Sequence, residues 1–117
     1  MLIRDLGDDR LTDAYGIRYQ QIYPHGGEDL ADWGLGRAVI APGGATEPHG
    51  HHEEHEVFVI LAGRGVMVIG DEEREVAARQ AVLIPNGADH FLRNSSDTEP
   101  LEFLSLYWPP AMGALDL

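Results

Sequence analysis

Hydrophobic and polar residues alternate along most of this chain, in short runs separated by glycine and proline. The apolar runs lie at residues 17–23, 37–40, 57–61, 66–69, 81–84, 90–93 and 101–108. Short runs rich in β-branched and aromatic residues are typical of strands, and Gly70 with Asp71 fits a hairpin turn. No segment after residue 16 shows a helical period. The pattern therefore predicts an all-β sandwich or barrel.

The chain is predicted to form one domain with a short extension at each end. Its 117 residues favour a single domain. Residues 1–16 are acidic and weakly patterned, and we expect an arm that either enters the fold irregularly or pairs with a neighbouring subunit. Residues 17–110 form the β domain and residues 111–117 a loose tail. A chain of this size buries more apolar surface as a dimer, so we expect a homodimer.

Composition narrows the classes of function. The chain has 20 acidic residues, 8 basic residues that are all Arg, and a net charge of -12. This charge repels phosphate backbones and anionic lipids, so we expect no nucleic-acid or membrane partner. The absence of Lys excludes Schiff-base chemistry, and the absence of Cys excludes disulfides, thiolate nucleophiles and Cys-ligated zinc. No run reaches membrane-spanning length and no signal-peptide pattern is present, so a cytoplasmic protein is expected.

Four of the six histidines fall between residues 49 and 55. One interpretation is a solvated polar loop without chemistry. A second is the helical zinc-protease pattern, met by His51, Glu54 and His55. That pattern requires a helix, whereas Pro48 and Gly50 precede the cluster and β-branched residues follow it.

A third interpretation places the cluster on strands. Residues two apart share one face of a strand, so His49 and His51 point the same way, and Glu56 shares the face of Phe58. Two imidazoles and a carboxylate form a partial site for a borderline divalent metal. A fourth ligand should come from elsewhere, and His90 is the only other histidine in the second half of the chain.

Two motifs in the chain resemble those of the cupin superfamily. The first motif consists of Gly43, His49, His51, Glu56 and Gly63, and every spacing is met. The resemblance covers residues 43–94 and, with the flanking strands, most of the chain.

The second motif consists of Pro85, Gly87, His90 and Asn94. It departs from the family pattern at Arg79, where the family has Gly. This departure brings the local turn into question, because a residue other than Gly rarely adopts a positive φ.

The resemblance implies a small antiparallel jelly-roll β-barrel. It also implies that His49, His51, Glu56 and His90 hold one divalent metal ion, with Zn, Fe, Ni and Mn all left open. The motif glycines and Pro85 would be structural, and Asn94 would hold a loop by hydrogen bonds.

Several inward-facing residues are candidates for contacting a substrate. An Arg37 that faces inward would pair with a substrate carboxylate, and one that faces outward would be a surface residue. For the aromatic candidates the alternative is ordinary barrel core. The substrate-binding predictions are Tyr19, Arg37, Phe58 and Tyr107, and further candidates for the pocket mouth are Gln21, Tyr23, Trp33, Phe91 and Ser105.

The ligand set leaves two positions of an octahedral metal for a substrate. We therefore expect a metal-dependent enzyme of dioxygenase, isomerase, lyase or cyclase type that acts on a polar small molecule. One alternative is a non-catalytic cupin that binds or senses a small molecule. Another is the cupin part of a natural-product biosynthetic enzyme, next to a synthetase-like domain.

Overall fold

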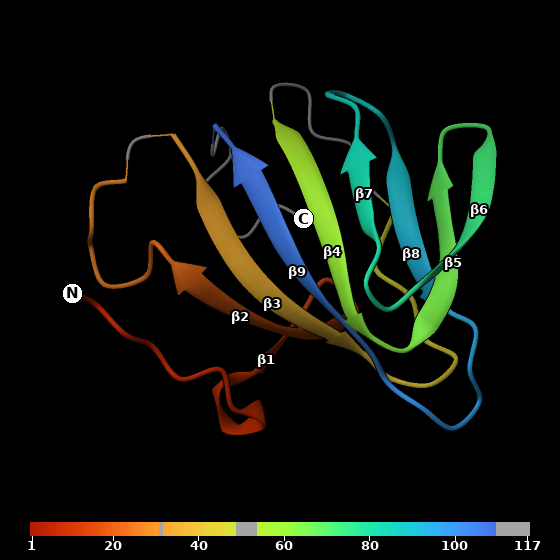
Figure 1. The fold of residues 1–117 in the computed structure, drawn as a ribbon, viewed down its shortest axis with the longest axis horizontal. Coiled ribbons are helices and arrows are strands. Elements are labelled where there is room, and N and C mark those ends of the chain that lie inside the picture. The colour runs from red at the N-terminus through yellow and green to blue at the C-terminus, as the bar shows by residue number, and fades with distance from the viewer. Residues whose placement is uncertain (31, 49–53, 110–117) are drawn as a thin grey trace.

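The computed structural model describes residues 1–30, 32–48 and 54–109, and strands are the main regular secondary structure of this described part (Figure 1). A single turn of 3₁₀ helix, η1 (Asp8–Arg10), precedes the first strand. The strands are β1 (Thr12–Ala14), β2 (Ile17–Tyr23), β3 (Gly34–Ile40), β4 (His55–Ala62), β5 (Arg64–Ile69), β6 (Glu72–Ala77), β7 (Ala81–Ile84), β8 (His90–Asn94) and β9 (Leu101–Trp108).

The strands form two antiparallel sheets. The larger sheet has the order β1-β2-β3-β9-β4-β7 and the smaller one the order β6-β5-β8. An isolated bridge between Ala45 and Arg93 ties the segment after β3 to the smaller sheet. No named strand of one sheet pairs with a named strand of the other among the described residues, so the two sheets face each other as an open barrel. The prediction of an all-β antiparallel fold is confirmed. No helix in the described part of the chain is long and apolar enough to cross a membrane.

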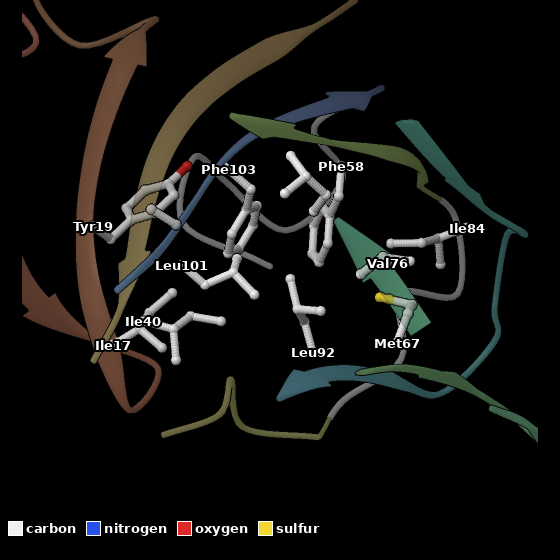
Figure 2. Packing of buried hydrophobic residues seen from close by; sticks show 12 residues of the cluster. Ile17, Tyr19, Ile40, Phe58, Met67, Val76, Ile84, Leu92, Leu101 and Phe103 are labelled. Atoms are coloured by element: carbon white, nitrogen blue, oxygen red, sulfur yellow. The ribbon is translucent and has the colours of Figure 1, made fainter. Parts of the chain in front are cut away.

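The core lies between the two sheets (Figure 2). Along β4, Glu56, Phe58 and Ile60 all point inward, as the alternation predicts, and the residues between them are more exposed. Phe58 packs against Phe103 of β9 with ring centroids 4.4 Å apart. Burying one such side chain contributes about 1.5–3 kcal/mol to the free energy of folding.

Two strands were not expected from the pattern. β6 carries Glu72, Glu73, Arg74 and Glu75, and only Val76 is buried, so the strand lacks an alternating apolar face. Its strand conformation comes from pairing with β5, in which Ile69 lies opposite Glu72. The predicted hairpin turn at residues 70 and 71 is thereby confirmed. β1 lies inside the predicted arm and pairs with β2.

The rest of the N-terminal arm is held against the larger sheet by polar contacts. The guanidinium of Arg4 pairs with the carboxylate of Glu28 and also donates to the backbone oxygen of Ile22, at 2.8 Å. Asp8 accepts a hydrogen bond from Arg37 at 2.7 Å. The arm is therefore more ordered than its weak pattern indicates.

Positive φ angles mark the tight turns of both motifs. Gly43, Gly63 and Gly87 all adopt them, and a Cβ on Gly63 would lie 2.6 Å from the backbone oxygen of Pro100. Arg79 also adopts a positive φ, 76°, so the turn keeps the left-handed geometry without glycine. Its backbone N–H donates to the oxygen of Ile60 at 2.9 Å, which fixes the turn against β4.

Candidate functional site

Two of the four predicted metal ligands meet inside the barrel. Glu56 lies on the inner face of β4 in the larger sheet, and His90 begins β8 in the smaller sheet. The side chains of both residues are only 1% exposed, and His90 Nε2 lies 3.1 Å from Glu56 Oε1. The fold therefore brings an imidazole nitrogen and a carboxylate oxygen from opposite sheets to one buried point.

The ring of His90 is oriented by its other nitrogen. Nδ1 lies 3.0 Å from the backbone oxygen of Ala88, and a carbonyl oxygen accepts, so Nδ1 carries a proton and Nε2 faces Glu56. The ring of Phe58 packs edge-on against the imidazole of His90, with an angle of 74° between the two ring planes. Burial lowers the pKa of His90, but the hydrogen bonds to Glu56 and to the Ala88 oxygen outweigh it and leave the pKa raised.

The carboxylate of Glu56 is oriented by Ser105 of β9. Ser105 Oγ donates to Glu56 Oε2 at 2.7 Å, and Ser105 is completely buried. The register explains the contact, because Ser105 lies opposite Phe58, two residues from Glu56 on the same face of the sheet. Ser105 therefore lies behind the carboxylate, and its hydroxyl leaves Oε1 directed at His90.

A chain of hydrogen bonds runs from Tyr19 to Tyr107 on the same inner face. The hydroxyl of Tyr19 donates to Gln21 Oε1 at 2.8 Å, and Gln21 Nε2 donates to the hydroxyl oxygen of Tyr107 at 2.7 Å. Tyr107 lies opposite Glu56 in the β4–β9 register. The Tyr107 oxygen accepts from Gln21, so the hydroxyl proton of Tyr107 points toward a group other than this amide.

Burial is the main cause that raises the pKa values of both tyrosines. The pKa of Tyr107 rises to about 12, and the nearby carboxylates of Glu54 and Glu56 add to the shift. Both hydroxyls therefore stay protonated at neutral pH and serve as hydrogen-bond donors rather than bases.

Glu54 is a second buried acid that the motifs did not single out as a site residue. Its residue exposure is 2%, and its charge raises the pKa of Tyr107. The signal in the sequence was its position two residues before Glu56, which places both carboxylates on one face of an extended segment.

The structure does not bring every predicted substrate-binding residue to this point. The side chain of Arg37 points to the face of β3 opposite that of the buried Ala38. Its guanidinium pairs with the carboxylates of Asp8 and Glu102 on this outer face of the sheet. Arg37 therefore matches the outward-facing alternative, as a paired residue beneath the arm. Tyr23 and Trp33 pack edge-to-face against each other, and Trp33 is 38% exposed.

Phe58 and Tyr19 belong to the core cluster, which was the alternative considered for them, although both lie next to the polar groups described above. Phe91 is half-buried on β8, adjacent to His90.

The predicted ligands His49 and His51 lie outside the described residues. Within 1–30, 32–48 and 54–109, no three residues of the metal-binding types gather at one point. His55 begins β4 as an exposed residue stacked on Trp108, so it lies on the face opposite Glu56 and in a strand. This placement favours the strand interpretation of the histidine cluster over the helical zinc-protease pattern.

Comparison with known proteins places these features in a family. The cupin domain family matches residues 36–107. A Cupin 2 conserved barrel domain protein from Salinispora arenicola superposes with a TM-score of 0.82 at 29% identity, over 96% of this chain and 92% of that protein.

Among the curated relatives are two whose names state different functions. A mannose-1-phosphate guanylyltransferase of Escherichia coli is 32% identical over 86% of this chain, but the chain spans only 22% of that enzyme. An oxalate-binding protein of Thermotoga maritima is 30% identical over 60% of this chain and 57% of its own length. The match to the cupin domain covers more than half of the sequence and includes both motifs, so this chain belongs to the cupin family.

Proposed function

We propose that this protein is a metal-dependent cupin enzyme that acts on a small polar molecule, with His49, His51, Glu56 and His90 as the ligands of one divalent metal ion. The observation that carries the proposal is the 3.1 Å approach of His90 Nε2 to Glu56 Oε1 at a point where both side chains are only 1% exposed. Burying a carboxylate is costly unless it is paired or binds a metal.

The donor groups fit a borderline divalent ion. Imidazole nitrogen and carboxylate oxygen are ligands shared by Zn, Fe, Ni and Mn. Each described ligand is also held by a neighbour, His90 through the oxygen of Ala88 and Glu56 through Ser105. Such supporting hydrogen bonds typically accompany metal ligands. A bound divalent ion would supply Lewis acidity and coordination positions for substrate oxygens.

The chain's own polar groups would bind and orient the substrate. The hydroxyl of Tyr107 is held by Gln21, remains protonated at neutral pH, and lies on the face that carries Glu56. It suits a hydrogen bond to a carbonyl, carboxylate or hydroxyl oxygen of a bound substrate. Apolar neighbours such as Phe58 exclude water from the same region.

Metal content measured after purification without added metal tests the ligand set. We expect about one equivalent per chain in the wild type and in the His25→Ala control, since His25 is exposed and far from the motifs in sequence. His49→Ala, Glu56→Gln and His90→Ala should each lose most of the metal while remaining folded. Full metal content in all three folded variants would disprove the ligand set.

A non-catalytic binding protein is the second candidate, and the relationship to an oxalate-binding protein favours it. Small carboxylates and hydroxy acids should be screened for thermal stabilisation of the metal-loaded protein, and each stabilising compound followed by NMR for chemical change. Turnover supports the enzyme, whereas stabilisation without turnover supports a binding protein. Guanylyltransferase activity is not part of the proposal, because the chain spans only 22% of that relative.

A further inference from the structure

No arginine side chain is placed inside the barrel next to the candidate site. The chain has no Lys, and its eight basic residues are Arg that all belong to the described residues. Six of these arginines are exposed: Arg10, Arg18, Arg64, Arg74, Arg79 and Arg93. On β8, for example, Arg93 alternates with the buried Leu92 and Asn94 and so points away from the core. The six exposed guanidiniums therefore do not pair with a molecule inside the barrel.

The other two arginines are bound by carboxylates away from the interior. Arg4 lies in the N-terminal arm and pairs with Glu28. Arg37 lies on the outer face of β3, where Asp8 and Glu102 bind its guanidinium at 2.7 and 2.6 Å. A carboxylate or phosphate group of a substrate that enters the barrel therefore meets no arginine there.

The polar groups that line the candidate site are acidic or neutral. Glu54 and Glu56 are only 2% and 1% exposed, and both lie close enough to Tyr107 to raise the pKa of its phenol. Gln21 and Ser105 contribute an amide and a hydroxyl to the same inner face. Repulsion between like charges is stronger in an enclosed region than in water, because the effective dielectric constant is lower. The interior by itself therefore disfavours anions.

A divalent metal ion at the site would balance this charge without reversing it. Histidine binds a metal as the neutral imidazole, so the ligands contribute no further positive charge. The two charges of the ion are then matched by the two buried carboxylates of the described residues, Glu54 and Glu56. One anionic group of a substrate gains by binding the ion directly. A second anionic group would lie in the same enclosed region without a cation, and burying an unpaired charge is strongly unfavourable.

We propose that the substrate class of this site is a small hydroxylated or hydroxy-carbonyl compound with at most one anionic group, the one that binds the metal ion, an inference that rests on the proposed function. Dicarboxylates and phosphorylated compounds with a second anionic group are excluded from this class. Hydroxyl groups suit the site because they donate to carboxylate oxygens and also accept from phenol and amide donors.

Calorimetric titration of the zinc-loaded full chain with two matched compounds tests the proposal. The probes are 2-hydroxyglutarate and its 5-amide, which share the α-hydroxy carboxylate that binds a metal and differ in the charge of the far end. We expect the amide to bind at least about tenfold more tightly than the diacid at the same ionic strength. Equal affinities, a tighter diacid, or no binding of the amide at millimolar concentration would each overturn the proposal.

A pair of variants tests whether the buried charge causes the preference. Glu54→Gln should reduce the ratio of the two affinities to within about threefold, because it removes one of the two buried carboxylates. Glu72→Gln is the matched control, since it removes the same charge from an exposed side chain on β6 and should keep the full ratio. Thermal unfolding checks that each variant is folded. A folded Glu54→Gln variant with the wild-type ratio also overturns the proposal.

Zinc content, measured before each titration, separates this proposal from the proposed function. A chain that takes up no zinc refutes the proposed function. The same comparison on the metal-free chain then tests the charge argument, because Glu54 and Glu56 remain and the amide should still bind more tightly than the diacid. A zinc-loaded chain that prefers the diacid refutes the substrate class alone.

Discussion

Replacing Ser105 by alanine should weaken metal binding without unfolding the protein. Ser105 is fully buried, and its hydroxyl donates to Glu56 Oε2 at 2.7 Å. The hydroxyl holds the carboxylate so that Oε1 faces His90. Alanine removes one oxygen atom and leaves the packing nearly unchanged, so the variant isolates the orientation of Glu56.

The size of the effect follows from the type of hydrogen bond. A hydrogen bond to a charged group contributes about 1.5–3 kcal/mol, and about 1.4 kcal/mol corresponds to a tenfold change in affinity. The variant lacks this hydrogen bond in the metal-free state as well as in the metal-bound state. Only part of the free energy of the bond is therefore lost from metal binding. We therefore expect an affinity about tenfold weaker, at the lower end of the range of about 10–100-fold usual for such supporting residues.

The assay is a competitive titration of Zn²⁺ and Co²⁺ against a chelator, with thermal unfolding of each variant as the check on folding. Ser95→Ala is the matched control, because Ser95 is exposed and its hydroxyl donates to the backbone oxygen of Arg64 at 3.4 Å, away from Glu56 in sequence. An affinity within about twofold of wild type in a folded Ser105→Ala variant would refute the claim that this hydroxyl positions Glu56.

Three further predictions concern stability. Asn94 donates to the backbone oxygens of Ile40 at 3.0 Å and of Glu99 at 2.8 Å. Asn94→Ala should therefore lower the free energy of unfolding, measured in urea, by about 2–4 kcal/mol, and a decrease below about 1 kcal/mol would contradict this role. Arg79→Gly should stabilise the protein by up to about 1 kcal/mol in the same assay, because glycine adopts the positive φ without strain. A lower free energy of unfolding in this variant would show that contacts of the arginine side chain outweigh the backbone strain. Arg4 lowers the pKa of Glu28 from 4.5 to about 2, so this carboxylate stabilises the fold above pH 4.5 and the contribution is lost as the pH falls toward 2. The melting temperature of wild type should therefore drop more between pH 4.5 and 2 than that of Glu28→Gln, and parallel curves would exclude the linkage.

Local patterns were sufficient for the elements that carry their own signal. The strands at residues 17–23, 81–84 and 101–108 have the predicted bounds, because alternating or continuous apolar residues meet clear turn signals there. β6 was missed, since its stability comes from the register with β5 and not from its own acidic sequence. The prediction of metal ligands rested on residue types and spacing alone. For Glu56 and His90 the structure adds the distance between the carboxylate oxygen and the imidazole nitrogen.

The sequence alone determined the family, the strand alternation and the identity of the candidate ligands, because motif spacing and side-chain parity are local properties of the chain. Tertiary structure decided which groups support those ligands and which do not reach them. Ser105 lies behind Glu56 because β9 pairs with β4 in one register, and Arg37 lies under the arm because Asp8 and Glu102 reach it there. Contacts between strands distant in sequence depend on register and sheet order, which no single stretch of the chain specifies.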